Sequence, residues 1–147
     1  MIVLKWLPAF GGAATLGENI IDQLNSIYNF TVYSTESHTN RKTGKYNGCH
    51  QIVFKSIPFK KLNTFIYYIK SLLHALLLSD YDLIHLHHSD ALFILLLLKL
   101  KYKVIVTTHG SHIVTLRDKW KKYSWFFKWQ LKYLNSLPNI ITCVSKK

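Results

Sequence analysis

Histidines and small residues follow several apolar runs of the sequence, at points where a parallel sheet would place a binding cleft. The histidines are His87 and His88 after one run and His109 after another. Imidazole has a pKa near neutrality, so either protonation state is reachable and the ring can donate a hydrogen bond to a sugar hydroxyl or a leaving phosphate. For His109 a second interpretation stays open, because a histidine at a strand end can simply bond to backbone.

Two adjacent glycines, Gly11 and Gly12, follow the first apolar run. Without Cβ atoms the backbone can turn sharply and approach a ligand closely, and the start of a following helix adds partial positive charge towards an anion such as phosphate. An ordinary strand-to-helix turn uses glycine in the same way. Further small residues at expected strand ends are Gly110, Ser111 and Ser145.

The histidines do not complete a metal site in the sequence. His85 and His87 alternate with aliphatic residues, so both point to one face of their strand and His88 points to the other. No acidic or cysteine ligand follows at a spacing that would complete a zinc site. We therefore expect no bound metal, and a hydrogen-bonded pair of His85 and His87 lining the cleft.

Alternating strands and helices are expected to position these residues. Strands are predicted at 2–7, 30–34, 51–57, 82–88, 104–108 and 140–144. Helices are predicted at 16–27, 62–78, 91–100 and 117–135, with a long loop at 37–50. Strands that are apolar throughout and alternate with helices indicate an α/β fold. The expected architecture is a Rossmann-like open parallel sheet of about six strands with helices on both faces.

Two of these helices are expected to bury apolar side chains. In 62–78 the residues at helical spacing are Phe65, Ile66, Ile69, Leu72, Leu73 and Leu76, which predicts an amphipathic helix. The stretch 91–98 is apolar nearly all round but well below the roughly 18 residues of a membrane-spanning helix. We expect it to form a buried helix.

Composition narrows the class of protein. A chain of 147 residues with 49% hydrophobic residues predicts one domain, 1–147. The formal charge of +12 indicates an anionic partner, either nucleic acid, an anionic membrane surface or a phosphorylated substrate. Scattered lysines without a nucleic-acid-binding signature argue against nucleic acid. Cys49 and Cys143 lack CxxC spacing and no signal peptide is recognised, so a reducing, cytoplasmic setting is expected.

The last predicted helix carries a basic stripe. Arg117, Lys121, Lys128 and Lys132 fall together on one side, and Trp125 lies beside them. Such a stripe is either a solvated face or the lipid-contacting face of an interfacial helix. The second interpretation places the protein at the inner face of the cell membrane.

Four segments together resemble the N-terminal domain of glycosyltransferase family 4. They are the Gly-Gly loop PAFGGAA (8–14), the acidic-aliphatic-His strand DLIHLH (82–87), the Thr-x-His-Gly strand end VTTHG (106–110) and the closing strand ITCVSK (141–146). Their order and spacing agree with the family across nearly the whole chain. One departure is Ala13-Ala14, where the family commonly has an acidic or β-branched residue after the glycines.

The resemblance implies the N-terminal, acceptor-side half of a GT-B fold. The implied activity is that of a retaining glycosyltransferase of hexosyl type, with a UDP- or GDP-sugar as donor and no bound cofactor or metal. The acceptor would be a glycan or a lipid-linked molecule in cell-surface polysaccharide or glycolipid synthesis. The family's C-terminal domain, which holds most of the nucleotide sugar, is expected to be absent from this chain, which should be inactive alone.

The resemblance also implies roles for single residues. Gly11 and Gly12 would approach the donor phosphates, and His109 would reach the transferred sugar as the catalytic residue. Gly110 adjoins them in the cleft. By position at strand ends, the acceptor side is assigned His87, His88, Ser111 and Ser145. The alternative is a non-enzymatic protein that binds a membrane surface or another anion.

Overall fold

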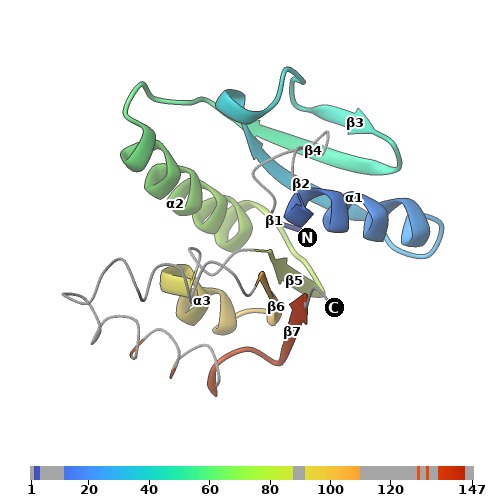
Figure 1. The fold of residues 1–147 in the computed structure, drawn as a ribbon, viewed down its shortest axis with the longest axis vertical. Helices are drawn as coiled ribbons and strands as arrows, with labels where there is room; N and C mark the ends of the chain where they lie inside the picture. Colours follow the sequence, from blue (N-terminus) through green and yellow to red (C-terminus); the bar gives the residue numbers. More distant parts are fainter. Residues whose placement is uncertain are drawn as a thin grey trace.

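The structure is a computed structural model that describes residues 2–3, 12–87, 92–109, 129, 132 and 136–144. Its strands are β1 (Ile2–Val3), β2 (Phe30–Thr35), β3 (Gly44–Tyr46), β4 (Cys49–Phe54), β5 (Leu83–Leu86), β6 (Lys103–His109) and β7 (Ile140–Val144). Its helices are α1 (Gly12–Leu24), the 3-10 helix η1 (Glu36–His38), α2 (Lys60–Leu78) and α3 (Leu92–Lys99). The α/β class predicted from the sequence is confirmed (Figure 1).

The described strands form one sheet in the order β3-β4-β2-β1-β5-β6-β7. All neighbours pair in parallel except β3, which pairs antiparallel with β4. The expectation of about six strands, all parallel, was therefore wrong for β3. Chain order runs outward from β1 in both directions, so β1 and β5 flank the point where the order reverses. In open sheets of this kind, ligands bind in the crevice beyond the carboxyl ends of the strands at that point.

The antiparallel strand lies inside the segment 37–50, which was expected to be a loop. A tight turn at Asn47 and Gly48 joins β3 to β4, and both residues have positive φ angles, 44° and 75°. Asn-Gly is the residue pair that such a hairpin turn favours. The segment was predicted to be a loop because its composition is polar, and the Asn47–Gly48 turn signal was not taken into account.

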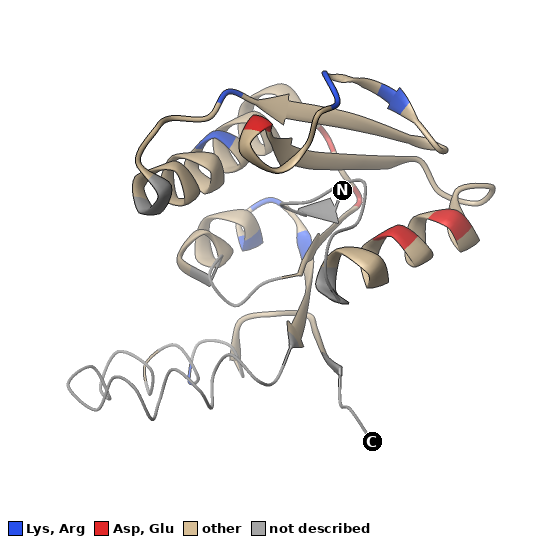
Figure 2. Ribbon diagram, turned by 45° about the horizontal axis from the view of Figure 1, so that its top comes forward, with Lys and Arg blue, Asp and Glu red and all other residues tan. Residues whose placement is uncertain are grey.

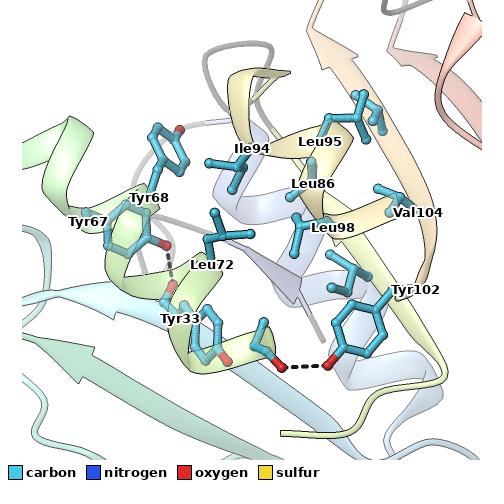
Figure 3. Close-up of a cluster of buried hydrophobic side chains, with 13 residues drawn as sticks. Tyr33, Tyr67, Tyr68, Leu72, Leu86, Ile94, Leu95, Leu98, Tyr102 and Val104 are labelled. Carbon is cyan, nitrogen blue, oxygen red and sulfur yellow. Dashed lines mark hydrogen bonds between the residues drawn. The ribbon is translucent and has the colours of Figure 1, made fainter. Parts of the chain in front are cut away.

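The larger core lies between the sheet and the helices α2 and α3 (Figure 3). Tyr67 and Tyr68 of α2 are almost fully buried there, beside Tyr33 of β2. The Tyr67 hydroxyl donates a hydrogen bond to the Tyr33 carbonyl oxygen at 2.8 Å. Likewise Tyr102, which follows α3, donates from its hydroxyl to the Ala75 carbonyl of α2. These tyrosines fix the helices on the sheet with both packing and hydrogen bonds.

A smaller core lies on the opposite face of the sheet, under α1. Ile21 of α1 packs there with Val32 of β2 and Cys49 of β4. Val32 and Tyr33 are consecutive and contribute to different cores, as the alternation of side chains along a strand requires. Described helices therefore cover both faces of the sheet, as expected (Figure 1).

The buried face of α2 differs in part from the one expected, because Leu72 is buried as predicted but other predicted positions are not. Phe65 and Leu73 are about half exposed, whereas Tyr67, Tyr68 and Ala75 are buried. The helix is apolar on two sides, and the side with the tyrosines packs on the sheet, where the Tyr67 hydroxyl finds an acceptor on β2. The expectation that α3 is a buried helix was also wrong for its outward side, which leaves Phe93, Leu96 and Leu97 between 40% and 53% exposed.

Most other element boundaries shift by a few residues. β4 begins two residues before the predicted strand and ends three earlier, and β5 is shorter than 82–88 at both ends. The predicted helix 117–135 lies outside the described residues except for positions 129 and 132. Among the helices that the structure describes, none has the length and apolarity needed to cross a membrane.

Candidate functional site

The carboxyl ends of β5, β6 and β7 lie side by side at the crevice edge of the sheet. His87 directly follows β5, and His109 is the last residue of β6, paired in register with Val144 of β7. Gly12 begins α1, whose first turn contains no acidic residue. The fold thus brings the backbone of these positions to one edge, as predicted for strand ends of a parallel sheet.

A row of hydrogen bonds crosses the three strands on one face of the sheet. His85 Nε2 lies 2.6 Å from Thr107 Oγ1, and Thr107 Oγ1 lies 2.6 Å from Thr142 Oγ1. Thr107 is almost fully buried, whereas Thr142 is exposed. The row ties β5 to β6 and β6 to β7 by side chains as well as by backbone, so it fixes the relative positions of the strand ends.

The next residue of β6 adds a contact on the opposite face. Thr108 donates a hydrogen bond from its hydroxyl to the Thr142 carbonyl oxygen at 3.5 Å. Thr108 is also buried. Two consecutive threonines therefore bind β7 immediately before His109, which restrains the backbone from which His109 extends.

The two histidines of β5 lie together on one face, as the alternation predicted. The ring centroids of His85 and His87 are 4.0 Å apart, and His87 is completely buried. The hydrogen bond of His85 joins it to Thr107 rather than to His87, so the expectation of a bonded histidine pair was wrong in its partner. The bond was not predicted because it joins residues 22 positions apart through the strand register.

Burial lowers the pKa of His85 to about 4. At neutral pH the ring is therefore uncharged and carries a single N–H. A neutral imidazole held at one nitrogen is suited to positioning its neighbours. It is a poor acid at that pH, because the protonated form is scarce.

A second polar cluster, missed from the sequence, lies at the carboxyl ends of β2 and β4. Thr35 Oγ1 is 2.7 Å from Ser56 Oγ, which also accepts the Ser37 backbone N–H at 2.8 Å. Asn63 of α2 donates to Ser37 Oγ at 3.1 Å and accepts the Ile57 N–H at 3.0 Å. The polar residues directly after the second predicted strand were the signal that could have found this cluster.

The remaining predicted site residues lie outside the part of the chain that the structure describes. They are Gly11, His88, Gly110, Ser111, Ser145, Arg117, Lys121, Trp125 and Lys128. Of the basic stripe, Lys132 is described and is exposed. Trp129, three residues before it, exposes 45% of its surface.

Metal-binding side chains do not gather in the described ranges. Among the described residues, no group of three or more His, Cys, Asp or Glu side chains is arranged to hold a metal ion.

Comparison with known proteins identifies a family that covers most of the chain. The model of the family described as Glycosyltransferase Family 4 matches residues 10–147. This range contains β2 to β7 and all the described helices. No curated protein matches the chain.

Proposed function

The chain belongs to glycosyltransferase family 4, and from this premise we propose that it is the acceptor-side domain of a retaining, nucleotide-sugar-dependent hexosyltransferase. The observation that carries the proposal is the bonded row His85–Thr107–Thr142 at the crevice edge, two residues before His109 on the same strand. It supports the proposal because a transferring sugar needs a rigidly held side chain beside it. The domain is proposed to be the Rossmann-like N-terminal half of a GT-B fold.

The reaction transfers a hexosyl group from a UDP- or GDP-sugar to a hydroxyl group. The bond between the anomeric carbon and the diphosphate oxygen breaks, and the acceptor oxygen forms the new bond to that carbon. The nucleoside diphosphate leaves, and the hydroxyl proton passes to the leaving phosphate or to water. In this proposal His109 donates a hydrogen bond to the transferring sugar as charge develops.

Charge on the departing diphosphate needs stabilisation by nearby positive groups. The backbone N–H groups at the start of α1 point towards the crevice edge, and no acidic residue of the first turn opposes them. We assign the donor phosphates to Gly11 and Gly12 on this basis, and Gly110 to the adjoining part of the cleft. A second Rossmann-like domain, in the same or a separate chain, would supply the rest of the donor site.

The acceptor is proposed to be a glycan or a lipid-linked molecule of cell-surface polysaccharide or glycolipid synthesis. His88, Ser111 and Ser145 are assigned to its side of the crevice, and the completely buried His87 is assigned there without direct contact with the acceptor. A basic helix carrying Lys132 and the exposed Trp129 would hold the enzyme at the inner face of the membrane. The competing function is that of a non-enzymatic binder of anionic surfaces.

The test measures sugar transfer and stability on the same variants. The chain is assayed with the second domain supplied, using labelled UDP- and GDP-hexoses and membrane-derived acceptors. His109→Ala is expected to lower turnover by roughly 10²-fold or more while the melting temperature changes little. His50→Ala, at an exposed position of β4, is the matched control and should leave both unchanged.

Two outcomes would contradict the proposal. A large fall in melting temperature, with the remaining folded enzyme fully active, would remove His109 from the site and assign it a backbone-bonded structural role. If the wild-type chain with its second domain transfers no hexose, the non-enzymatic alternative would be favoured.

A further inference from the structure

The outward sides of α2 and α3 carry large apolar side chains that no described part of the protein covers. On α2 these are Leu62, Phe65 and Leu73, and on α3 they are Phe93, Leu96 and Leu97. Each exposes between 40% and 53% of its surface. We call these six residues the apolar ridge. Scattered exposed leucines need no explanation, but a contiguous group of this size marks an interaction surface.

The ridge is one continuous surface. The rings of Phe65 and Phe93 stack across the two helices, with centroids 5.3 Å apart and planes inclined by 18°. Along α3 the exposed residues follow the three- and four-residue spacing of one helix side, which continues to Leu100 at 80% exposure. The opposite side of α3, with Ile94, Leu95 and Leu98, is buried in the core.

The charges on the two helices of the ridge are all positive, and the nearby exposed Asp80 is already ion-paired with Lys101 at 3.8 Å. The sequences of α2 and α3 contain lysines and no acidic residue. By helical spacing, Lys70 and Lys99 lie to the sides of the exposed rows rather than within them. The acidic residues Glu18 and Asp22 belong to α1, on the other face of the sheet (Figure 2).

This combination selects one kind of partner. In a symmetric pair of copies joined through the ridge, the same lysines would face each other with no carboxylate on these helices to pair with them. An anionic lipid surface attracts those lysines, and its acyl boundary accepts apolar side chains without requiring a complementary shape. Lysine stems can lie along the apolar surface while their ammonium groups reach the headgroups.

We propose that the apolar ridge of α2 and α3 is a membrane-docking surface that inserts into the headgroup and acyl boundary of an anionic bilayer. The docking itself goes beyond sugar transfer and does not depend on it. Both helices begin at the crevice edge, since α2 follows β4 and α3 follows β5. If the proposed function holds, the bilayer would lie beside the crevice, where a lipid-linked acceptor could enter it.

The experiment is flotation of the protein with vesicles of phosphatidylglycerol and phosphatidylcholine, compared with phosphatidylcholine alone. The wild-type chain is expected to float with the anionic vesicles and to be released by salt. The triple substitution Phe65→Gln, Leu96→Gln and Leu97→Gln is expected to weaken partitioning by about tenfold or more, because three apolar side chains no longer insert. Ile27→Gln is the matched control, since Ile27 is 69% exposed but follows α1.

A pair of single substitutions separates lipid from protein partners and guards against misfolding. Leu96→Glu and Leu96→Lys place charges of opposite sign at one exposed position and should perturb the fold alike. The lipid surface predicts that the Glu variant detaches from anionic vesicles while the Lys variant stays bound. Circular dichroism on both variants reports whether they fold, so the comparison uses folded protein.

Three results would overturn the docking surface. One is equal recovery with anionic and neutral vesicles. The second is a wild-type chain that is dimeric in light scattering while both Leu96 variants are monomeric, which would assign the ridge to contact with a second copy. The third is vesicle binding that survives the triple substitution but is lost when Arg117, Lys121, Lys128 and Lys132 are all replaced by Gln. None of these readouts uses turnover, so the docking surface can be refuted without affecting the proposed transferase function.

Discussion

Replacing Thr107 by valine should be the most informative single change near the strand ends, because one hydroxyl makes two hydrogen bonds of 2.6 Å. Valine keeps the shape of threonine, so the packing of β6 is preserved while both bonds are lost. At about 1 kcal/mol for each bond, Thr107→Val should lower the free energy of unfolding by about 2 kcal/mol. The loss should approach about 3 kcal/mol if the partly buried His85 nitrogen finds no other partner.

The matched variant is Thr142→Val, which removes only the outer bond of the row. Thr142 is exposed, and Thr107 can still bond to His85, so the expected loss is about 1 kcal/mol or less. Both single variants remove the bond between Thr107 and Thr142. The double variant should therefore lose about 1 kcal/mol less free energy of unfolding than the sum of the two single losses. Urea unfolding followed by circular dichroism measures all four proteins. A cost for Thr107→Val below about 0.5 kcal/mol, or below that of Thr142→Val, would refute the bonded row.

Three further predictions concern stability. The pKa of His85 is about 4 in the folded protein and near 6.5 in the unfolded chain, so between these pH values the unfolded chain binds more protons. The contribution of His85 to the free energy of unfolding should be complete above about pH 6.5 and should fall by up to ~3 kcal/mol towards pH 4. His85→Gln should remove this pH dependence from urea unfolding measured across the range. Tyr33→Phe deletes a buried hydroxyl that lies 2.8 Å from His74 Nδ1 and 3.1 Å from Tyr81 Oη, and should cost about 1–3 kcal/mol in the same assay; no change would show that water replaces the hydroxyl without cost. Gly48→Ala forces a side chain onto a φ of 75° and places its Cβ 2.7 Å from the Asn25 side chain, so the melting temperature should fall, whereas an unchanged value would argue against the Asn47–Gly48 turn.

Predictions from the sequence were best for the strands of the parallel sheet. β2, β5, β6 and β7 are short β-branched or aliphatic runs closed by polar residues, and these local signals determine a buried strand. β4 was predicted with shifted ends, whereas β3 was missed because the segment around it is mostly polar and only the Asn47–Gly48 pair marks the turn.

Helix faces were harder to predict, since α2 and α3 are apolar on more than one side. Periodicity identified Phe65 and Leu73 as core residues, but the helix packs through Tyr67 and Tyr68, and the Tyr67 hydroxyl needs its acceptor on the distant strand β2. The choice between two apolar faces therefore depends on tertiary contacts that spacing does not encode.

For the candidate site, the sequence predicted which strand ends carry polar groups but not how they connect. His85 and His87 were correctly placed on one face because alternation is a local property. The bonds from Thr107 to His85 and Thr142 depend on the register between three strands. Likewise, the cluster of Thr35, Ser56 and Asn63 joins segments that only the fold brings together.

The short antiparallel strand β3 also protects the protein against aggregation. A parallel sheet ending at β4 would offer a six-residue row of open backbone groups to any other extended chain. β3 covers three of those residues and is itself only three residues long. Its middle residue, Lys45, is exposed, and the Arg41 guanidinium lies 4.9 Å over the Tyr46 ring. A strand from another copy would meet these positive charges, so at this edge charge repulsion opposes the growth of an intermolecular sheet.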